Sequence, residues 1–210
     1  MIVAIDGPAG AGKSTVARAL AERLGFRYLD TGAMYRALTW LAMQQGVDLG
    51  DATALAVIAQ AQPVTFDEEG RVWIAGTDVT SSIREQRIDR MVPVVARHHA
   101  VREVMRERQR ELGREGDVVI EGRDIGTVVA PQAEVKVYLV ADREERAKRR
   151  MADRPGIGAD ALATDLKSRD EKDAERMQPA ADAQQIDTTN LRVEDVVERI
   201  EALVRARTAA

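Results

Sequence analysis

A nine-residue stretch near the start of the sequence, GPAGAGKST at residues 7–15, combines three glycines with a lysine and two hydroxyls. It fits the pattern G-x-x-x-x-G-K-[ST], in which glycines let backbone N–H groups turn inward toward phosphate oxygens. Lys13 can reach the β- and γ-phosphates, and the Ser14 hydroxyl can ligate Mg²⁺. The pattern therefore predicts a loop that binds a nucleoside triphosphate through Gly7, Pro8, Ala9, Gly10, Ala11, Gly12, Lys13, Ser14 and Thr15.

The elements on either side of this loop favour the same interpretation. An apolar run at residues 2–5 precedes it, and apolar residues at helical spacing follow it as far as Leu24 and Gly25, where the glycine is a natural helix stop. A helix that starts near Gly12 directs its N-terminal dipole at a bound anion. An ordinary glycine-rich turn is the alternative, but strand, loop and helix in this order are the context that the phosphate loop requires.

The composition limits the classes of protein to which the chain can belong. Its 210 residues predict one domain, 45% are hydrophobic and 31% charged, and the net charge is −4. These values, with no long apolar run and no basic leader, predict a cytoplasmic protein with no membrane or nucleic-acid partner. The absence of cysteine excludes disulfides and thiolate chemistry. Arginine outnumbers lysine 26 to 5, which we attribute mostly to composition bias, so only the placement of single arginines can indicate function.

Strands and helices are expected to alternate along most of the chain. Strands are predicted at residues 2–6, 26–29, 117–124, 134–142 and 185–187, and helices at 13–24, 30–46, 52–61, 84–112, 143–151, 159–176 and 193–207. In the long charged helix, Pro93 is expected at an interruption or a first turn. Residues 63–80 instead alternate apolar and polar side chains around turn signals at Glu69-Gly70 and Ala75-Gly76, which predicts a small antiparallel β unit. The pattern as a whole predicts a three-layer α/β fold with a mostly parallel sheet.

Polar clusters follow four further strands of this predicted sheet. They are Asp30-Thr31, Glu121-Gly122-Arg123-Asp124, Asp142 and Asp187-Thr188-Thr189. An open α/β sheet binds ligands beyond the carboxyl ends of its strands, so these clusters are expected to converge near the phosphate loop. Each has a simpler interpretation on its own; Thr31 and Asp142, for example, would be good helix N-caps.

A phosphate loop by itself does not distinguish a kinase from a switch GTPase, a motor ATPase or a regulatory nucleotide sensor. A GTPase needs an N-K-x-D motif for guanine, whereas the sole asparagine of this chain is Asn190, in TTNLR. This absence argues against the GTPase interpretation, and the other classes remain.

Six blocks together resemble the bacterial cytidylate kinase family: IDGPAGAGKST, YLDTGAMYRA, VVIEGRDIGTVV, EERAKRRM, RDEKDAER and IDTT, in this order. The resemblance runs from residue 2 to about residue 205. It implies a P-loop kinase fold with a mostly parallel five-stranded sheet, a core at about 1–31, 117–142 and 178–210, a monophosphate-binding part at 32–116 with the β insertion 63–80, and a helical lid at 143–177. It further implies a monomer that uses ATP and Mg²⁺ to phosphorylate CMP and dCMP.

Carried over residue by residue, the family's CMP site comprises Thr31, Arg36, Arg102, Arg123, Asp124, Arg169, Asp173 and Arg176. Lys13, Arg123, Arg169 and Arg176 would act in catalysis, and Asp124 suits the cytosine amino group because a carboxylate accepts from that donor. One or two of the lid arginines Arg146, Arg149 and Arg150 would clamp phosphate.

One position departs from the family pattern. About nine residues before Arg102, where the family usually has a serine that contacts the base, this chain has Pro93. Proline lacks that hydroxyl and a backbone N–H, so a kinase for another acceptor, such as UMP, AMP or a sugar acid, stays open. A separate alternative is a regulatory nucleotide-binding protein that has lost transfer. Such a protein would be expected to lack some of the acceptor-side residues that this chain keeps.

Overall fold

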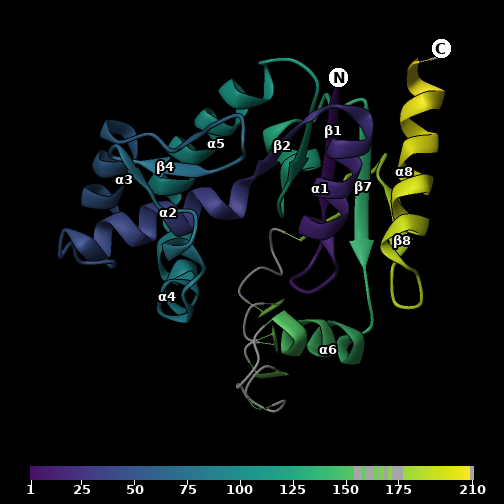
Figure 1. The fold of residues 1–210 in the computed structure, drawn as a ribbon. Coiled ribbons are helices and arrows are strands. Elements are labelled where there is room, and N and C mark those ends of the chain that lie inside the picture. The colour runs from purple at the N-terminus through teal and green to yellow at the C-terminus, as the bar shows by residue number, and fades with distance from the viewer. Residues whose placement is uncertain (154–157, 159–162, 165, 168–169, 172–176, 209–210) are drawn as a thin grey trace. The chain divides into compact units, whose positions relative to one another are not determined.

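The computed structural model describes residues 1–153, 158, 163–164, 166–167, 170–171 and 177–208. The chain forms two compact units, which are described separately: Met1–Leu29 with Glu115–Ala210, and Asp30–Arg114. Figure 1 labels their elements. Within the described part of the chain, no helix has both the length and the apolar character needed to cross a bilayer.

A five-stranded sheet forms the centre of the first unit (Figure 1). Its order is β2-β6-β1-β7-β8, and the pairs β1–β6, β1–β7 and β7–β8 are parallel. The central strand β1 is buried on both faces, as the strands of a parallel sheet usually are. The strands are β1 (Ile2–Asp6), β2 (Arg27–Asp30), β6 (Val118–Glu121), β7 (Val135–Val140) and β8 (Gln184–Asp187).

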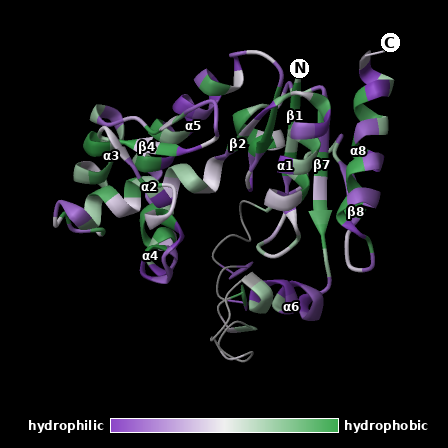
Figure 2. Ribbon diagram, in the orientation of Figure 1, coloured by the Kyte–Doolittle hydropathy of each residue, from purple (hydrophilic) through white to green (hydrophobic). Residues whose placement is uncertain are grey.

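Two helices of the first unit pack on one face of this sheet. Val3 and Ile5 of β1 belong to a buried cluster with Leu20 of α1 (Lys13–Leu24) and Ile200 of α8 (Val193–Thr208). Figure 2 shows hydrophobic and hydrophilic residues alternating along α8, the pattern of a helix with one buried face. The unit also contains α6 (Arg143–Asp153) and the π-helical turn η2 (Ile125–Val129).

The second unit combines helices with a small antiparallel sheet in the order β3-β4-β5. Ala75 and Gly76, between β4 and β5, have φ values of 50° and 71°. Two consecutive positive φ values are typical of the tight turns that join antiparallel strands. The elements are α2 (Thr31–Gln44), α3 (Ala52–Ala61), β3 (Thr65–Phe66), β4 (Val72–Ile74), β5 (Thr77–Asp78), η1 (Ser82–Arg84), α4 (Gln86–Ala96) and α5 (His99–Gly113).

The predicted α/β fold class, with a parallel five-stranded sheet and a small antiparallel sheet, is confirmed. The prediction for Pro93 was wrong. It lies inside α4, neither in the first turn nor at an interruption, and the helix continues to Ala96. Ile88 and Val95, on either side of the proline, are fully buried, so tertiary packing holds the helix through a residue that weakens it locally.

Candidate active site

The phosphate loop, residues 7–15, connects the end of β1 to the start of α1. Gly7 has φ 143°, and a Cβ there would lie 2.2 Å from Leu139 O, so only glycine fits between the loop and β7. Gly12, with φ 89°, is the N-cap of α1 and has no side chain to cap the helix. The first N–H groups of α1 therefore form the electropositive helix end that a phosphate loop needs.

Lys13 is the first residue of α1, and 6% of its surface is exposed. Its Nζ donates to Pro8 O at 2.9 Å, which holds the ammonium against the loop itself. Ser14 and Thr15 follow on the exposed surface of the same turn. The loop thus gathers a buried cation, two hydroxyls and the helix N-terminus.

Arg146 of α6 joins this helix to the phosphate loop. It is 6% exposed, and its Nη1 donates to Ala9 O at 3.1 Å. Its guanidinium also forms a two-pronged ion pair with Asp170, with distances of 3.0 and 2.6 Å. A Cβ at Gly10 would stand 3.0 Å from both Cβ and O of Arg146, so the helix and the loop are in close contact. Arg146 thus links α6 to the loop through Ala9 and to Asp170 through its charge.

Arg149 lies one helical turn further on, beside the N-terminus of α1. A Cβ at Gly12 would be 3.4 Å from its Nη1. Its guanidinium donates to the hydroxyl and carbonyl oxygens of Thr188 at 2.9 and 2.7 Å, and to Glu145 at 3.1 Å. The Thr188 hydroxyl lies 3.1 Å from Ala11 O, so these contacts hold the guanidinium at the mouth of the phosphate loop.

A pocket of about 370 Å³ opens beside Arg149. One side is the phosphate loop, and the other sides are α6 and the segment that leads from β8 into α8. Its walls are mostly apolar and its charged groups are few, a combination typical of small-molecule sites. The lining residues are Gly10, Ala11, Gly12, Thr15, Val16, Glu145, Arg149, Ala152, Thr188, Leu191, Arg192, Val193 and Val196.

The turn after β6, residues 122–129, carries Arg123 and Asp124, both half-buried. Asp124 is the N-cap of η2, and its backbone carbonyl accepts from the N–H groups of Val128 and Val129. Asp6, at the end of β1, accepts from the N–H groups of the next two residues, Ile125 and Gly126, at 2.9 and 2.8 Å. We call residues 122–129 the acceptor turn, because the family resemblance assigns Arg123 and Asp124 to the site of the phosphoryl acceptor.

Burial raises the pKa of Asp6, and the two N–H groups of the acceptor turn oppose that rise without cancelling it. Glu121, one residue before the acceptor turn, is also buried and accepts from the Tyr28 hydroxyl at 2.5 Å. Both carboxylates at this end of the sheet therefore hold neighbouring segments of the first unit in place.

Asp30, where β2 meets the second unit, begins a similar arrangement there. Its carboxylate caps α2 by accepting from Ala33 N at 2.8 Å and pairs with Arg36 Nη2 at 2.7 Å. Burial alone would raise the pKa of Asp30, but Arg36, the Ala33 N–H group and Arg84 outweigh it, so the pKa is lowered. The cap interpretation of Thr31 was therefore wrong, because Asp30 caps the helix and Thr31 is its first, buried residue.

The arginine-rich run at residues 102–110 lies within α5. Arg102 is half-buried, and its Nη1 lies 3.5 Å from Arg97 O. Arg106 and Arg108 instead pair with glutamates one turn away, at 2.8 and 2.9 Å. These ion pairs are the helix-face charges that the sequence also allowed for this run, but the side chain of Arg106 is only 15% exposed.

The model of one family, described as cytidylate kinase, matches residues 3–206 of the chain. The chain belongs to this family. A cytidylate kinase of Geobacillus sp. (strain WCH70) is 48% identical over 98% of this chain and 96% of its own length. One of Bacillus licheniformis is 45% identical over 97% and 96%, respectively.

Among solved structures, a gluconokinase from Sinorhizobium meliloti 1021 covers 99% of this chain and 93% of its own, with a TM-score of 0.54 and 13% identity. At that identity the likeness concerns the fold alone. Membership in the cytidylate kinase family identifies the chain as a phosphotransferase with a nucleotide-binding P-loop. The resemblance inferred from the sequence motifs is thus confirmed.

The structure brings some residues of the expected family site together and leaves others apart. In the first unit, the phosphate loop contacts α6 through Arg146 and Arg149, and Asp6 links the strand that enters this loop to the acceptor turn. Arg150 is half-buried in α6. In the second unit lie Thr31, Arg36 and Arg102. The remaining predictions, Arg169, Asp173 and Arg176, fall outside the described residues.

The sequence interpretation missed Asp6, and it gave Thr188 no role of its own. For Asp6 a signal existed, because it ends the first strand directly before Gly7, and strand ends are where such a sheet positions functional groups. For Thr188 the signal was weak, because its role depends on contacts with Ala11 and Arg149, far away in the sequence.

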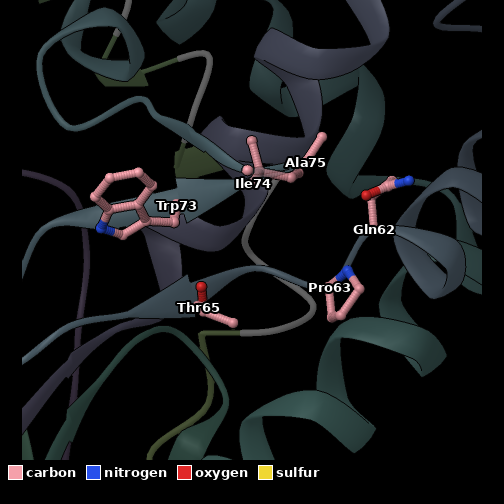
Figure 3. A pocket seen from close by; sticks show the side chains of 7 residues that line it. Gln62, Pro63, Thr65, Trp73, Ile74 and Ala75 are labelled. Carbon is pink, nitrogen blue, oxygen red and sulfur yellow. The ribbon is translucent and has the colours of Figure 1, made fainter.

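Among the described residues, no group of three or more His, Cys, Asp or Glu side chains could hold a metal ion. A pocket of about 310 Å³ in the second unit lies on the small sheet (Figure 3). It lacks ionisable side chains, so it offers no chemistry for phosphoryl transfer. Its lining is Gln62, Pro63, Thr65, Trp73, Ile74, Ala75 and Gly76.

Proposed function

We propose that this phosphotransferase moves the γ-phosphoryl group of ATP to CMP and dCMP, releasing ADP and forming CDP and dCDP for pyrimidine nucleotide metabolism. The observation that carries the proposal is the phosphate loop with a cation and a pocket beside it, in a chain of the cytidylate kinase family. A guanidinium at the mouth of the loop suits the charge that develops on a transferred phosphoryl group.

For the donor, residues 7–15 would surround the phosphates of ATP with backbone N–H groups, and Lys13 would exchange Pro8 O for the β- and γ-phosphates. Of the three lid arginines, Arg149 is the one we assign to phosphate, because it lies beside Gly12. The base would occupy the neighbouring pocket, where Leu191 and Val196 supply apolar wall. Arg146 would keep α6 in place.

Mg²⁺ would be held by the Ser14 hydroxyl together with the phosphates. The donor set suits this ion, since Mg²⁺ usually takes one or two protein oxygens and otherwise phosphate and water, and Ser14 is exposed in the first turn of α1. When bound, the ion neutralises charge that develops on the transferred group. The lack of a carboxylate cage among the described residues agrees with such a shared site.

For the acceptor, the proposed contacts are those that the family resemblance implies. Asp124 would accept from the cytosine amino group, Arg36 and Arg123 would hold the phosphate, and Thr31 and Arg102 would complete the site. Arg169 and Arg176 would face phosphate, and Asp173 the sugar hydroxyls. Residues 32–116 would form the monophosphate-binding part and 143–177 the lid of one monomeric, cytoplasmic enzyme.

Phosphoryl transfer requires mainly that the protein position the donor and acceptor phosphates. Phosphoryl transfer passes through a loose, in-line transition state, so the chain must align donor and acceptor and neutralise charge. The acceptor phosphate is already an anion and needs no dedicated general base. Water has to be kept from the acceptor position, because its attack would turn the kinase into an ATPase.

A coupled ADP-release assay with ATP and Mg²⁺ tests the function. The acceptors are CMP, dCMP, UMP, AMP and GMP, with an acceptor-free control. We expect fast turnover with CMP and dCMP alone, which would also show that Pro93 preserves cytosine selection. Comparable turnover with UMP would shift the assignment to a broader pyrimidine kinase, and a rate equal to the acceptor-free control for every nucleotide would refute the proposal.

A further inference from the structure

Asp6 occupies the junction between the two loops of the first unit. It is the last residue of β1, and Gly7, the next residue, begins the phosphate loop. Only 5% of Asp6 is exposed, yet both carboxylate oxygens are used: Oδ1 accepts from Ile125 N at 2.9 Å and Oδ2 from Gly126 N at 2.8 Å. One side chain thus links two segments that are 119 and 120 residues apart.

The two N–H groups belong to the start of η2, directly after Arg123 and Asp124. The N-cap of η2, Asp124, makes no side-chain cap hydrogen bond. Asp6 supplies that cap from a neighbouring strand, where a carboxylate is favoured by the N–H groups and the helix dipole. Asp6 therefore provides the cap that the side chain of Asp124 does not.

The surroundings of Asp6 allow little displacement. A Cβ on Gly126 would lie 3.4 Å from Asp6 Oδ2 and 3.3 Å from Lys136 Cδ, and a Cβ on Gly7 would clash with Leu139 O. The turn η2 is π-helical, a rare form that often occurs at functional sites. Among the described residues, no guanidinium pairs with either oxygen of Asp6, and burying such a carboxylate is costly. This cost argues that the position serves more than stability.

We propose that Asp6 is a positioning residue that sets the acceptor turn, and with it Arg123 and Asp124, relative to the phosphate loop. The proposal rests on the proposed function, in which those two residues hold CMP. Because its two oxygens accept from backbone N–H groups, Asp6 acts through the backbone of this turn. Its removal is expected to weaken the acceptor side selectively.

The test compares Asp6→Ala and Asp6→Asn with the wild-type chain at a temperature where circular dichroism shows all three folded. We expect Asp6→Ala to raise the KM for CMP by about 10–100-fold and to change the KM for ATP by less than about twofold. Asp6→Asn, which keeps one acceptor oxygen, should give a smaller rise. If Asp6→Ala does not fold, the same comparison with Asp6→Asn decides.

The matched control is Asp117→Asn, at the opposite end of β6, where the exposed carboxylate accepts from the amino group of Met1. It should leave both KM values unchanged. Amide hydrogen exchange of Ile125 and Gly126 gives a readout independent of activity, and it should become faster in both Asp6 variants. Equal weakening of ATP and CMP, or an unchanged CMP KM in a folded variant, would overturn the proposal. A wild-type chain without CMP-dependent ADP release would instead refute the proposed function.

Discussion

Asp6 and Asp30 follow the same design in the two units, with opposite electrostatic outcomes. Each ends a strand, is buried and accepts backbone N–H groups at the start of a helical segment. The pKa of Asp6 is raised because burial dominates, whereas that of Asp30 is lowered because Arg36 and its other partners outweigh burial.

The difference shows that the neighbours of a strand-end carboxylate decide what it does. Asp6 fixes a stretch of backbone by accepting from the N–H groups of Ile125 and Gly126. Asp30 fixes both a helix start and the guanidinium of Arg36, which is itself a proposed ligand of CMP. Mutation of Asp6 therefore tests the alignment of a backbone segment, and mutation of Asp30 tests the alignment of an arginine.

The largest effect is expected from Lys13→Ala. This change removes the cation that is proposed to bind the phosphates of ATP. Turnover should fall roughly a thousandfold, because a preorganised charge at the transferred phosphate is lost. The fold should stay intact by circular dichroism. Lys148→Ala, on an α6 lysine whose side chain is 73% exposed, is the matched control and should retain full activity. Near-normal turnover of Lys13→Ala would remove Lys13 from the mechanism.

Asp124→Ala tests the group that Asp6 is proposed to position. The KM for CMP should rise by about 10–100-fold, since a base contact of this kind contributes on the order of 1–3 kcal/mol. The KM for ATP is the internal control and should stay constant. If both constants rose equally in steady-state assays, Asp124 would have no role in reading the base.

Asp30→Asn tests the arginine side of the comparison. Asparagine still caps a helix, so the change removes chiefly the charge that holds Arg36. We expect the KM for CMP to rise by about three- to tenfold with the KM for ATP unchanged. Asp51→Asn is the matched control, because Asp51 caps α3 in the same unit through Thr53 and Ala54 N–H groups alone. An Asp30→Asn enzyme with wild-type CMP kinetics would show that Arg36 needs no partner.

Urea unfolding between about pH 3.5 and pH 7 should show that the two aspartates contribute to stability with opposite pH dependence. For Asp30, the unfolded state binds more protons below its usual pKa of 3.8, so this group stabilises at neutral pH and the gain is lost in acid. For Asp6, the folded state keeps its proton to higher pH, so stability falls as pH rises above 3.8. The difference in free energy of unfolding between the wild type and Asp30→Asn should therefore increase with pH. The difference between the wild type and Asp6→Asn should decrease with pH. Slopes of the same sign would contradict the assignment.

Trp73→Phe should have the smallest effect. It removes the hydrogen bond from the indole N–H to Asp67 at 2.9 Å, on the small sheet of the second unit. The urea midpoint should fall slightly, and kcat and both KM values should change by less than about twofold, as for other surface substitutions. A large, selective loss of CMP binding would show that the small sheet takes part in acceptor recognition.

Much of the fold could be predicted from the sequence because its signals are local. The apolar strand before Gly7, the helix stop at Gly25 and the turn at Ala75-Gly76 each depend on a few adjacent residues, and each was predicted. Pro93 was misplaced because burial of Ile88 and Val95, a tertiary effect, outweighs the local cost of proline in α4.

The sequence by itself determined the phosphate loop and the family, since both reside in the identity and spacing of residues along the chain. It could not choose among the lid arginines. Arg146 and Arg149 lie one helical turn apart and are chemically identical, and only Asp170 and Thr188, brought from distant segments, give them different contacts. The same holds for Asp6, because the N–H groups that define its role lie about 120 residues away and meet it only once the sheet has formed.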